Sequence, residues 1–251
     1  MKFENKVCVI TGGANGIGKD LVKSYLEEGA YVAFIDTDEE AGQLLTKNYP
    51  QEKLLFVVGD LTEESVIHEF VEQIKLKFKH VDYLINNACI GKGGILSNCS
   101  YEDFNYVLKL GVTAPYLLSK LLVDSFNPSA SIINISSTRA RMSQEDTESY
   151  SAAKGGISAL THALSISLAY RVRVNSISPG WIETGDNIHS QEDKAQHPAG
   201  RVGKSTDITK MVMFLCSEDA SFITGEDITI DGGMSKQMIY HGDKGWFFNK
   251  K

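Results

Sequence analysis

Short apolar runs recur along the chain, separated by longer segments of mixed, helix-compatible composition. The runs are nearly continuous in apolar residues, which is typical of strands buried on both faces. Strands that alternate with helices form a parallel sheet covered by helices on both sides. We therefore predict a doubly wound α/β domain with seven strands, at Val7–Ile10, Tyr31–Ile35, Leu54–Val58, Val81–Ile85, Ser131–Ile135, Val172–Ile177 and Asp227–Ile230.

The first predicted strand is followed by a glycine-rich turn and then by a helical segment from Lys19 to Glu28. Gly12 permits a tight turn, Gly16 lets backbone amides approach a pyrophosphate, and Gly18 lets the helix pack close to the sheet. A helix N-terminus placed there favours phosphate. The spacing is G-x-x-x-G-x-G, and taken alone it fits an ordinary loop equally well. The turn reads Thr11-Gly12-Gly13-Ala14-Asn15-Gly16-Ile17-Gly18.

The second predicted strand ends in Asp36, eighteen residues past Gly18. An acidic side chain near this offset accepts hydrogen bonds from the adenosine ribose of a dinucleotide. The alternative is a solvated carboxylate, because Asp38, Glu39 and Glu40 follow closely. A carboxylate at this place repels a 2′-phosphate, so the expected cofactor is NAD rather than NADP.

Tyr150 and Lys154 are four residues apart and share one face of a predicted helix. A free tyrosine titrates near ~10, too high for a base at neutral pH, but a neighbouring ammonium stabilises the phenolate. An exposed helix pair with no function has the same spacing. Ser137, thirteen residues upstream, and the glycine turn favour the catalytic interpretation.

The amino-acid composition limits the classes to which this protein can belong. The 251 residues are 42% apolar, and no linker or repeat divides them, so one domain is expected over 1–251. The net charge of −7 and the lack of basic clusters with aromatic residues argue against nucleic acid. No signal peptide and no run near ~18 apolar residues are present, so we expect a cytoplasmic protein with no membrane partner. The cysteines predict neither a metal site nor disulfides: Cys8, Cys89, Cys99 and Cys216.

Jointly, the motifs follow one order along the chain. After the glycine turn come Asp60-Leu61, Asn86-Asn87-Ala88, Ser137, Tyr150, Lys154 and Pro179-Gly180. In this order and spacing, roughly residues 3 to 235 resemble the short-chain dehydrogenase/reductase family. The resemblance implies a single Rossmann-like domain, a nicotinamide cofactor and hydride transfer between a small-molecule alcohol and its carbonyl.

The resemblance also implies the site residues. Asp60 and Leu61 border the adenine, Asn87 and Ala88 line the ribose side, and Thr184 lies near the nicotinamide carboxamide. The full expected cofactor-binding set is Gly12, Asn15, Gly16, Ile17, Gly18, Asp36, Asp60, Leu61, Asn87, Ala88, Tyr150, Lys154, Pro179, Gly180, Ile182 and Thr184.

The expected catalytic residues are Ser137, Tyr150 and Lys154. Tyr150 exchanges the hydroxyl proton, Lys154 supports it and holds the nicotinamide ribose, and Ser137 hydrogen-bonds the reacting oxygen. Ser136 is the alternative serine, but the thirteen-residue spacing to Tyr150 favours Ser137. A nucleophilic serine would need a histidine; none is close in sequence, and His162 is expected to be a packed side chain. A histidine general base stays open.

Two positions depart from the family pattern. Gly111 stands where an asparagine usually holds a water in the proton relay, which puts the relay in doubt; glycine could leave room for an extra water. Cys89 stands where glycine is usual, and we expect it to fill a packing gap. A nicotinamide-binding sensor or scaffold with weak turnover is therefore the alternative function.

The sequence gives less information about the substrate than about the cofactor and the catalytic residues. The pocket is expected to be built by 89–99, 138–148 and 181–200. Polar residues there favour a sugar or polyol over other secondary alcohols, although any solvated loop is polar. They are Arg139, Arg141, Gln144, Glu145, Glu148, Asp186 and His189.

The resemblance implies a homotetramer, or a homodimer, in which helices near Leu117–Phe126 and Ser151–Tyr170 pair across a two-fold axis. Beyond the family core, residues 237–251 form a C-terminal tail. A disordered tail seldom carries so many large apolar groups, so this one is expected to be buried somewhere. The two candidates are the surface of a neighbouring subunit and a lid over a substrate pocket; we expect the first, with the tail also closing the neighbour's active site. The apolar groups are Met238, Ile239, Tyr240, Trp246, Phe247 and Phe248.

Overall fold

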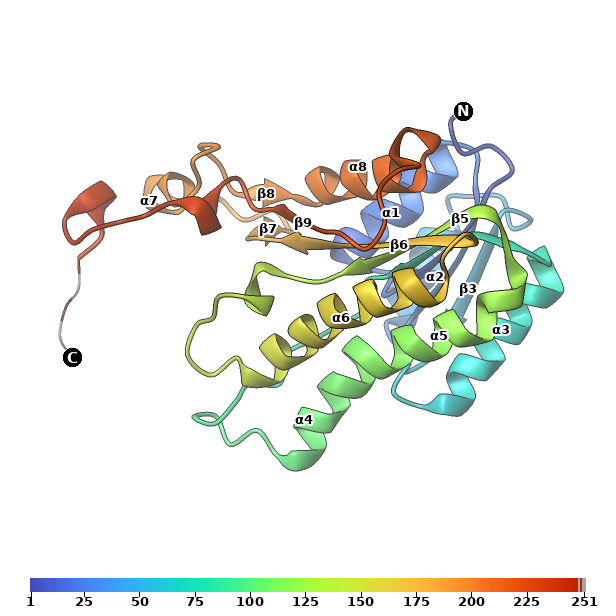
Figure 1. Cartoon of the computed structure of the whole chain (residues 1–251), viewed down its shortest axis with the longest axis horizontal. Helices are drawn as coiled ribbons and strands as arrows, with labels where there is room; N and C mark the ends of the chain where they lie inside the picture. Colours follow the sequence, from blue (N-terminus) through green and yellow to red (C-terminus); the bar gives the residue numbers. More distant parts are fainter. Residues whose placement is uncertain (248, 250–251) are drawn as a thin grey trace.

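The computed structural model describes residues 1–247 and 249 and contains a seven-stranded parallel sheet (Figure 1). All seven predicted strands are present, and their order is β3-β2-β1-β4-β5-β6-β9. The doubly wound, Rossmann-like fold is therefore confirmed. The strands are β1 Val7–Thr11, β2 Tyr31–Asp36, β3 Leu54–Val58, β4 Val81–Asn86, β5 Phe126–Ile135, β6 Val172–Pro179 and β9 Asp227–Ile230.

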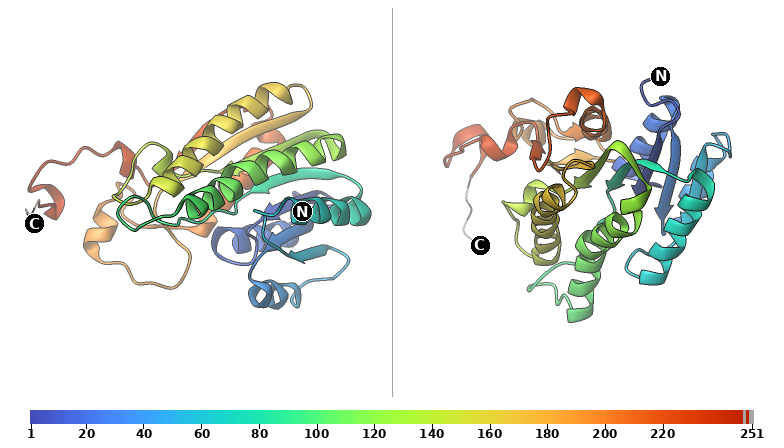
Figure 2. Two further views of the ribbon diagram at one scale, coloured as in Figure 1. Left: turned by 90° about the horizontal axis from the view of Figure 1, so that it is seen from below. Right: turned by 45° about the vertical axis from the view of Figure 1, so that its right-hand side comes forward.

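Helices cover both faces of this sheet (Figures 1 and 2). On one face lie α1 (Gly16–Glu27), α2 (Glu39–Thr46) and α8 (Ser205–Cys216), whose buried side chains share one core cluster with the sheet. On the other face, α3 (Glu64–Phe78), α5 (Ala114–Leu122) and α6 (Glu148–Ser167) contribute to a second cluster. With apolar groups on both sides, the inner strands β1, β2, β4 and β6 are largely buried on both faces, as their nearly continuous apolar runs predict.

Shorter elements join these layers. Two-residue strands β7 (Ile182–Glu183) and β8 (Gly203–Lys204) pair with each other outside the main sheet. The sequence prediction missed both, because two residues give no detectable period. The remaining elements are α4 (Tyr101–Leu108), η1 (Lys109–Thr113), η2 (Val123–Ser125), η3 (Thr138–Ala140), α7 (Gln191–Ala195), η4 (Glu218–Ala220), η5 (Met234–Lys236) and η6 (Asp243–Gly245).

One helical stretch, Tyr101–Ser125, is long and apolar enough to cross a membrane by length and composition, with a mean hydropathy of 1.3. Polar residues interrupt this stretch, so it contains no continuous apolar run of about 18 residues. In the fold, Val107, Leu118 and Leu122 are fully buried. Leu118 and Leu122 belong to the core on one face of the sheet, as expected for a helix that covers a sheet.

Some sequence expectations are wrong in detail. The predicted helix to Phe126 ends at Ser125, and Phe126 begins β5. The predicted helix to Tyr170 ends at Ser167, and Tyr170 takes a left-handed turn conformation with φ of 67°. His162 is exposed on α6 rather than packed, because it lies on the face turned away from the sheet.

Candidate functional site

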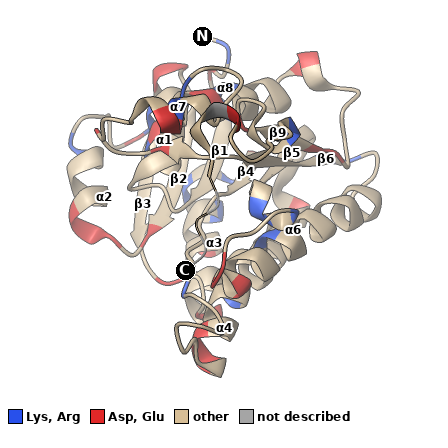
Figure 3. Cartoon of the chain, turned by 90° about the vertical axis from the view of Figure 1, so that its left-hand side faces the viewer, with Lys and Arg blue, Asp and Glu red and all other residues tan. Residues whose placement is uncertain are grey.

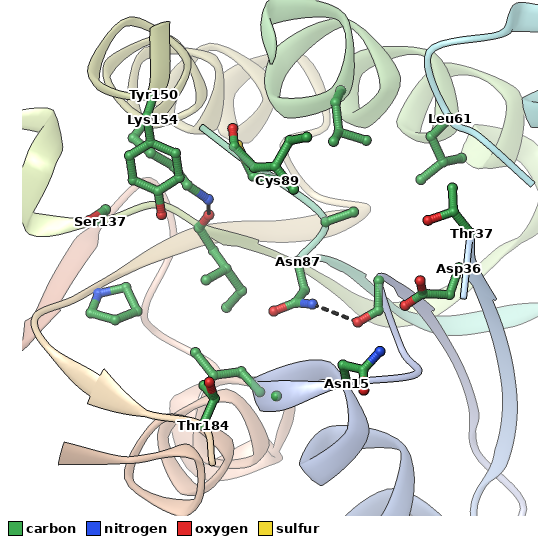
Figure 4. Close-up of a pocket in the computed structure, with 18 of the residues that line it drawn as sticks. Asn15, Asp36, Thr37, Leu61, Asn87, Cys89, Ser137, Tyr150, Lys154 and Thr184 are labelled. Carbon is green, nitrogen blue, oxygen red and sulfur yellow. Dashed lines mark hydrogen bonds between the residues drawn. The ribbon is translucent and has the colours of Figure 1, made fainter. Parts of the chain in front are cut away.

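A cavity of about 540 Å³ opens at the carboxyl ends of the strands, where α/β sheets bind ligands. Figure 4 shows Tyr150, Lys154 and Ser137 at one end and Asp36, Thr37 and Leu61 at the other. The expected site residues line it with the exception of Gly18. It is lined by Gly12, Asn15, Gly16, Ile17, Asp36, Asp60, Leu61, Asn87, Ala88, Ser137, Tyr150, Lys154, Pro179, Gly180, Ile182 and Thr184, among others.

The glycine turn brings backbone close to this cavity. Gly12 and Gly16 have left-handed φ angles of 66° and 53°, which residues other than glycine rarely adopt. Gly18 lies behind the turn: a Cβ there would be 1.8 Å from the carbonyl oxygen of Gly12. Gly18 therefore has a packing role, which explains why it does not line the cavity. The turn as a whole places the first residues of α1 at the cavity.

The N-terminus of α1 has no side-chain cap. Asn15 at the N-cap has extended backbone, with φ of −134° and ψ of 165°, and makes no capping hydrogen bond. Its side-chain amide donates instead to Asp38 at 2.8 Å. The first N–H groups of α1 thus keep their capacity to bind an anion such as a pyrophosphate.

Asp36 is fixed at the far end of the cavity by backbone amides. Its Oδ2 accepts the N–H of Ala14 at 2.9 Å, and its Oδ1 accepts the N–H of Asp38 at 3.0 Å. The bond to Ala14 ties the end of β2 to the glycine turn. Each carboxylate oxygen retains a second lone pair, so the group can still accept hydrogen bonds from a ribose diol.

Asn87 fastens the end of β4 to the glycine turn from the other side. Its side-chain amide donates to the carbonyl oxygens of Thr11 and Gly12, both at 3.0 Å. The hydroxyl of Thr11 accepts the backbone N–H groups of Asn87 and Ala88 at 2.9 and 3.0 Å. These bonds set the two walls of the cavity at a fixed separation.

Tyr106 is a cavity residue that the sequence analysis did not single out. Its hydroxyl donates to Oδ2 of Asp60 at 2.9 Å, while Oδ1 accepts the N–H of Thr62 at 2.9 Å. Burial and the Asp60 carboxylate raise the pKa of Tyr106, so the phenol stays protonated and donates. The Lys92 ammonium lies 4.6 Å from the centre of the Tyr106 ring. No local sequence motif reveals the contact between Tyr106 and Asp60, because α4 and the end of β3 are distant in sequence and come together only when the chain folds.

Tyr150 and Lys154 lie on the first two turns of α6, facing the cavity. Lys154 is only 3% exposed, and its Nζ donates to the carbonyl oxygen of Ile135 at 2.6 Å. The same Nζ is 5.3 Å from the centre of the Tyr150 ring. A buried ammonium beside the phenol stabilises a phenolate during proton exchange.

The two candidate serines have different partners. Ser136 Oγ donates to the backbone carbonyl of Lys154 at 2.9 Å and lies 2.8 Å from Ser158 Oγ, so it ties β5 to α6. Ser137 Oγ accepts the backbone N–H of Arg139 at 3.1 Å, which leaves its own proton available. Figure 4 shows Ser137 on the same side of the cavity as the Tyr150 phenol. This geometry favours Ser137 over Ser136, and no histidine of the described residues lines the cavity.

Gly111 and Cys89, the two departures from the family pattern, are in contact. A Cβ built on Gly111 would lie 3.1 Å from Cys89 Sγ and 3.0 Å from Ala153 Cβ. Cys89 and Ala153 therefore occupy the direction in which a side chain at residue 111 would project. That glycine leaves room for a water of the proton relay stays a prediction. Burial raises the pKa of the Cys89 thiol, against the opposing charge of Lys154, so the thiol is neutral.

The polar residues expected to form the substrate side are largely engaged within the protein. Arg139 donates to Gln144, Arg141 pairs with Asp227, and Glu148 accepts the N–H of Ile95. Exposed apolar side chains occupy the same three loops. We call them the apolar rim: Ile90, Ile95, Leu96, Met142, Trp181 and Ile188.

The segment 181–200 has internal contacts of its own. His189 Nε2 lies 2.8 Å from Glu183 Oε2, and the His189 ring meets Trp181 edge to face at 5.1 Å. The N–H of Gly185, the Asn187 side chain and His189 lower the pKa of Glu183. Within the described residues, no group of three or more His, Cys, Asp or Glu side chains is arranged to hold a metal ion.

Comparison with known proteins connects this site to a family. A family model described as enoyl-(acyl carrier protein) reductase matches residues 12–235. An uncharacterized oxidoreductase of Thermotoga maritima is 39% identical over 95% of this chain and 99% of its own. L-fucose dehydrogenase of Mus musculus is 32% identical over 92% of this chain and 89% of its own.

Solved structures agree on the fold. An apo SCOR enzyme from Clostridium thermocellum has a TM-score of 0.90 and 48% identity, covering 98% of this chain and 99% of its own. A 3-ketoacyl-(acyl-carrier-protein) reductase from Brucella melitensis, complexed with NADH, has a TM-score of 0.85 and 32% identity, covering 93% and 99%. A blue fluorescent protein from a metagenomic library, in complex with NADPH, has a TM-score of 0.85 and 28% identity, covering 94% and 100%. The matches span nearly the whole chain, and this protein belongs to the short-chain dehydrogenase/reductase family of oxidoreductases.

Proposed function

We propose that this protein is an NAD(H)-dependent oxidoreductase that interconverts a secondary alcohol and a ketone. The observation that carries the proposal is the placement of Ser137, Tyr150 and Lys154 at one end of a cavity whose other end holds Asp36. Proton-transfer groups and a dinucleotide-binding turn thus meet in one space. Binding of a nicotinamide alone would not require the serine.

The residues present fit a nicotinamide dinucleotide. The uncapped α1 N-terminus and the left-handed Gly12 and Gly16 would hold the pyrophosphate, and Asp36 the adenosine ribose. A Cβ on Gly16 would lie 3.3 Å from Thr184, so glycine keeps this approach open. When bound, the nicotinamide supplies the hydride acceptor or donor.

The chain's own residues handle the proton. In oxidation, Tyr150 removes the hydroxyl proton of the alcohol, and in reduction it returns a proton to the carbonyl oxygen. Ser137 donates a hydrogen bond to the same oxygen and orients it. Lys154 stabilises the phenolate from its buried position and is placed to hold the nicotinamide ribose.

NAD is the proposed cofactor because Asp36 is fixed by two amides and no Arg or Lys stands at Ala14, Asn15 or Thr37 to bind a 2′-phosphate. We expect kcat/KM to be about tenfold or more higher with NAD than with NADP, since each ~1.4 kcal/mol is a factor of ten. Asp36→Ala should reduce that ratio by removing the repulsion. Equal kcat/KM for the two cofactors in the wild-type protein would refute the preference.

A sugar or polyol is the proposed substrate class. A relative named L-fucose dehydrogenase supports it. A second candidate is a ketone with an apolar chain, because the apolar rim is exposed and one solved relative is a 3-ketoacyl-(acyl-carrier-protein) reductase. Initial rates on sugars, polyols, hydroxy acids, steroids and 3-oxoacyl thioesters separate the two. No turnover on any of them, with tight NAD binding, would favour the sensor or scaffold function.

A further inference from the structure

The C-terminal tail projects from the body of the molecule and contacts α7 through η6. In Figures 1 and 2 it projects beyond 181–200. The residues that line the cavity include Pro179 and Gly180 at the end of β6 and Ile182 and Thr184 at the start of this segment. The apolar side chains of the tail face solvent. The exposed fractions are 76% for Met238, 38% for Ile239, 67% for Tyr240, 50% for Trp246 and 60% for Phe247. Phe248 lies outside the described residues.

The projecting segment is nevertheless ordered by its own contacts. The N–H of Gly242 donates to the Trp246 carbonyl at 2.8 Å, and the N–H of Trp246 donates to the Asp243 carbonyl at 2.8 Å. The ring of His241 meets Trp246 and Phe247 edge to face, at 6.1 and 5.5 Å. These contacts form a preformed hook, Met238–Phe247, with aromatic groups on its surface. A surface ordered before binding loses less entropy when it binds.

The hook does not cover the chain's own cavity. Within the hook, η6 (Asp243–Gly245) contacts α7 (Gln191–Ala195), which belongs to the segment 181–200. Figure 3 views this end of the molecule and shows the tail in front of the strand ends, while Figure 1 shows that it stands off from them. To fold back onto its own apolar rim, the hook would have to leave α7. The rim and the hook are thus two exposed apolar surfaces at one end of the same chain.

Charge also distinguishes the two surfaces. The tail, 237–251, carries three lysines and one acid, Asp243. The three loops of the rim carry four basic residues against seven acids, the acids being Glu145, Asp146, Glu148, Glu183, Asp186, Glu192 and Asp193. The hook itself carries Asp243 and Lys244, and the tail's other two lysines follow it in the sequence. The tail as a whole is therefore basic and aromatic, and complements an acidic mouth with an apolar rim.

We propose that the hook of one copy of this chain binds the apolar rim of a second copy and completes the substrate end of that copy's cavity. The exchange is reciprocal across a two-fold axis, so each contact is made twice. Trp246 and Phe247 are the anchors, as aromatic groups commonly are at interfaces. The effect on turnover rests on the proposed oxidoreductase function, whereas the contact itself does not.

The first test needs no substrate. The chain has two tryptophans, so in a Trp181→Phe background fluorescence reports Trp246 alone. We expect iodide to quench Trp246 several-fold less than free tryptophan, and the rim substitution Leu96→Asp to restore quenching. Leu76→Asp, at a residue 86% exposed on α3, is the matched control and should leave quenching unchanged. Because Trp181 belongs to the rim, the wild-type protein is measured as well. Full quenching of Trp246 in the Trp181→Phe protein, with full quenching of both tryptophans in the wild-type protein, would overturn the proposal.

The second test shows which copy the hook serves. A chain ending at residue 236 keeps its own Tyr150, and a full-length Tyr150→Phe chain keeps its hook. On a verified substrate the truncated chain should show a KM raised by about tenfold or more. Mixing the two by co-expression should give activity several-fold above their sum, because the second chain's hook completes the first chain's site.

Activity equal to the sum would mean that the hook acts on its own chain, or on neither, and would contradict the proposal. Unchanged kinetics of the truncated chain would do the same. If truncation prevents folding, the full-length double variant Trp246→Ala/Phe247→Ala replaces it in the mixture. Loss of all turnover in the wild-type protein would count against the proposed function alone, because quenching still reports the contact.

Discussion

Gly111 and Cys89 are far apart in sequence, yet in the structure each explains the other. The thiol occupies the space that a side chain on residue 111 would need, next to Ala153 and one residue from Lys154. Each departs from the family pattern when taken singly. Together they form one packed contact between the end of β4, the π-turn η1 and α6, at the wall of the cavity.

Gly111→Ala should therefore lower the free energy of unfolding by about 1–3 kcal/mol, because its Cβ overpacks Cys89 and Ala153. Cys89→Gly in the same chain should recover part of that loss, and a denaturant double-mutant cycle measures the coupling. The control is Gly155→Ala, where a Cβ meets nothing within 4 Å. Equal costs for Gly111→Ala and Gly155→Ala would rule out the overpacking.

Residue-level prediction from the sequence succeeded where a motif carries the information. The glycine turn, Asp36, Tyr150 and Lys154 line one cavity because strand ends in a parallel sheet meet at one edge. It missed Tyr106, whose contact with Asp60 joins two elements far apart in sequence. The sequence likewise shows the polar residues of the substrate loops. It does not show that these residues bind partners within the fold, because partners such as Asp227 and Ile95 are distant in sequence.

At the scale of elements, the strands were the most predictable part of the chain. Burial on both faces gives the inner strands nearly continuous apolar runs, and all seven predicted strands are present. Helix ends were less predictable, since Phe126 and Tyr170 suit either the end of a helix or the start of the next segment. The β7–β8 pair depends on hydrogen bonds between segments that the sequence does not place together.

The start of α8 offers a test of how 181–200 is anchored. Arg201 donates from both terminal nitrogens to Asp207, at 2.7 Å each, and the N–H of Lys204 donates to Asp207 at 2.8 Å. These hydrogen bonds lower the pKa of Asp207 from 3.8 to about 2. A bidentate pair of this kind ties Arg201, which precedes β8, to the first turn of α8.

Because the folded-state pKa of Asp207 is lowered, its contribution to stability is complete above pH 3.8 and is lost as the pH falls towards 2. Asp207→Asn should reduce the free energy of unfolding at neutral pH by about 1 kcal/mol, after allowance for partial exposure. The variant should also lose less stability than wild type over that acid range in urea titrations. A parallel loss in both proteins would contradict this, and Glu52→Gln, an exposed acid, serves as control.

At the scale of the whole molecule, apolar groups remain exposed on the helices that the family resemblance assigns to subunit pairing. Tyr116 on α5 is 48% exposed and Ile166 on α6 is 78% exposed. We predict a homotetramer, because surfaces of this kind are covered when helices pair across a two-fold axis. Light scattering at micromolar concentration should give a mass four times that of one chain, and a monomer would refute the prediction.

In the proposed mechanism, Tyr150 exchanges the proton during alcohol oxidation by NAD. On a verified substrate, Tyr150→Phe should reduce kcat at least about a thousandfold, within the range that general acid–base groups contribute, while circular dichroism and NAD affinity stay close to wild type. The matched control is Tyr101→Phe, which removes a phenol oxygen from a position on α4 that is 79% exposed and should leave kcat unchanged. Retention of a tenth of the wild-type kcat by Tyr150→Phe would show that another group is the base.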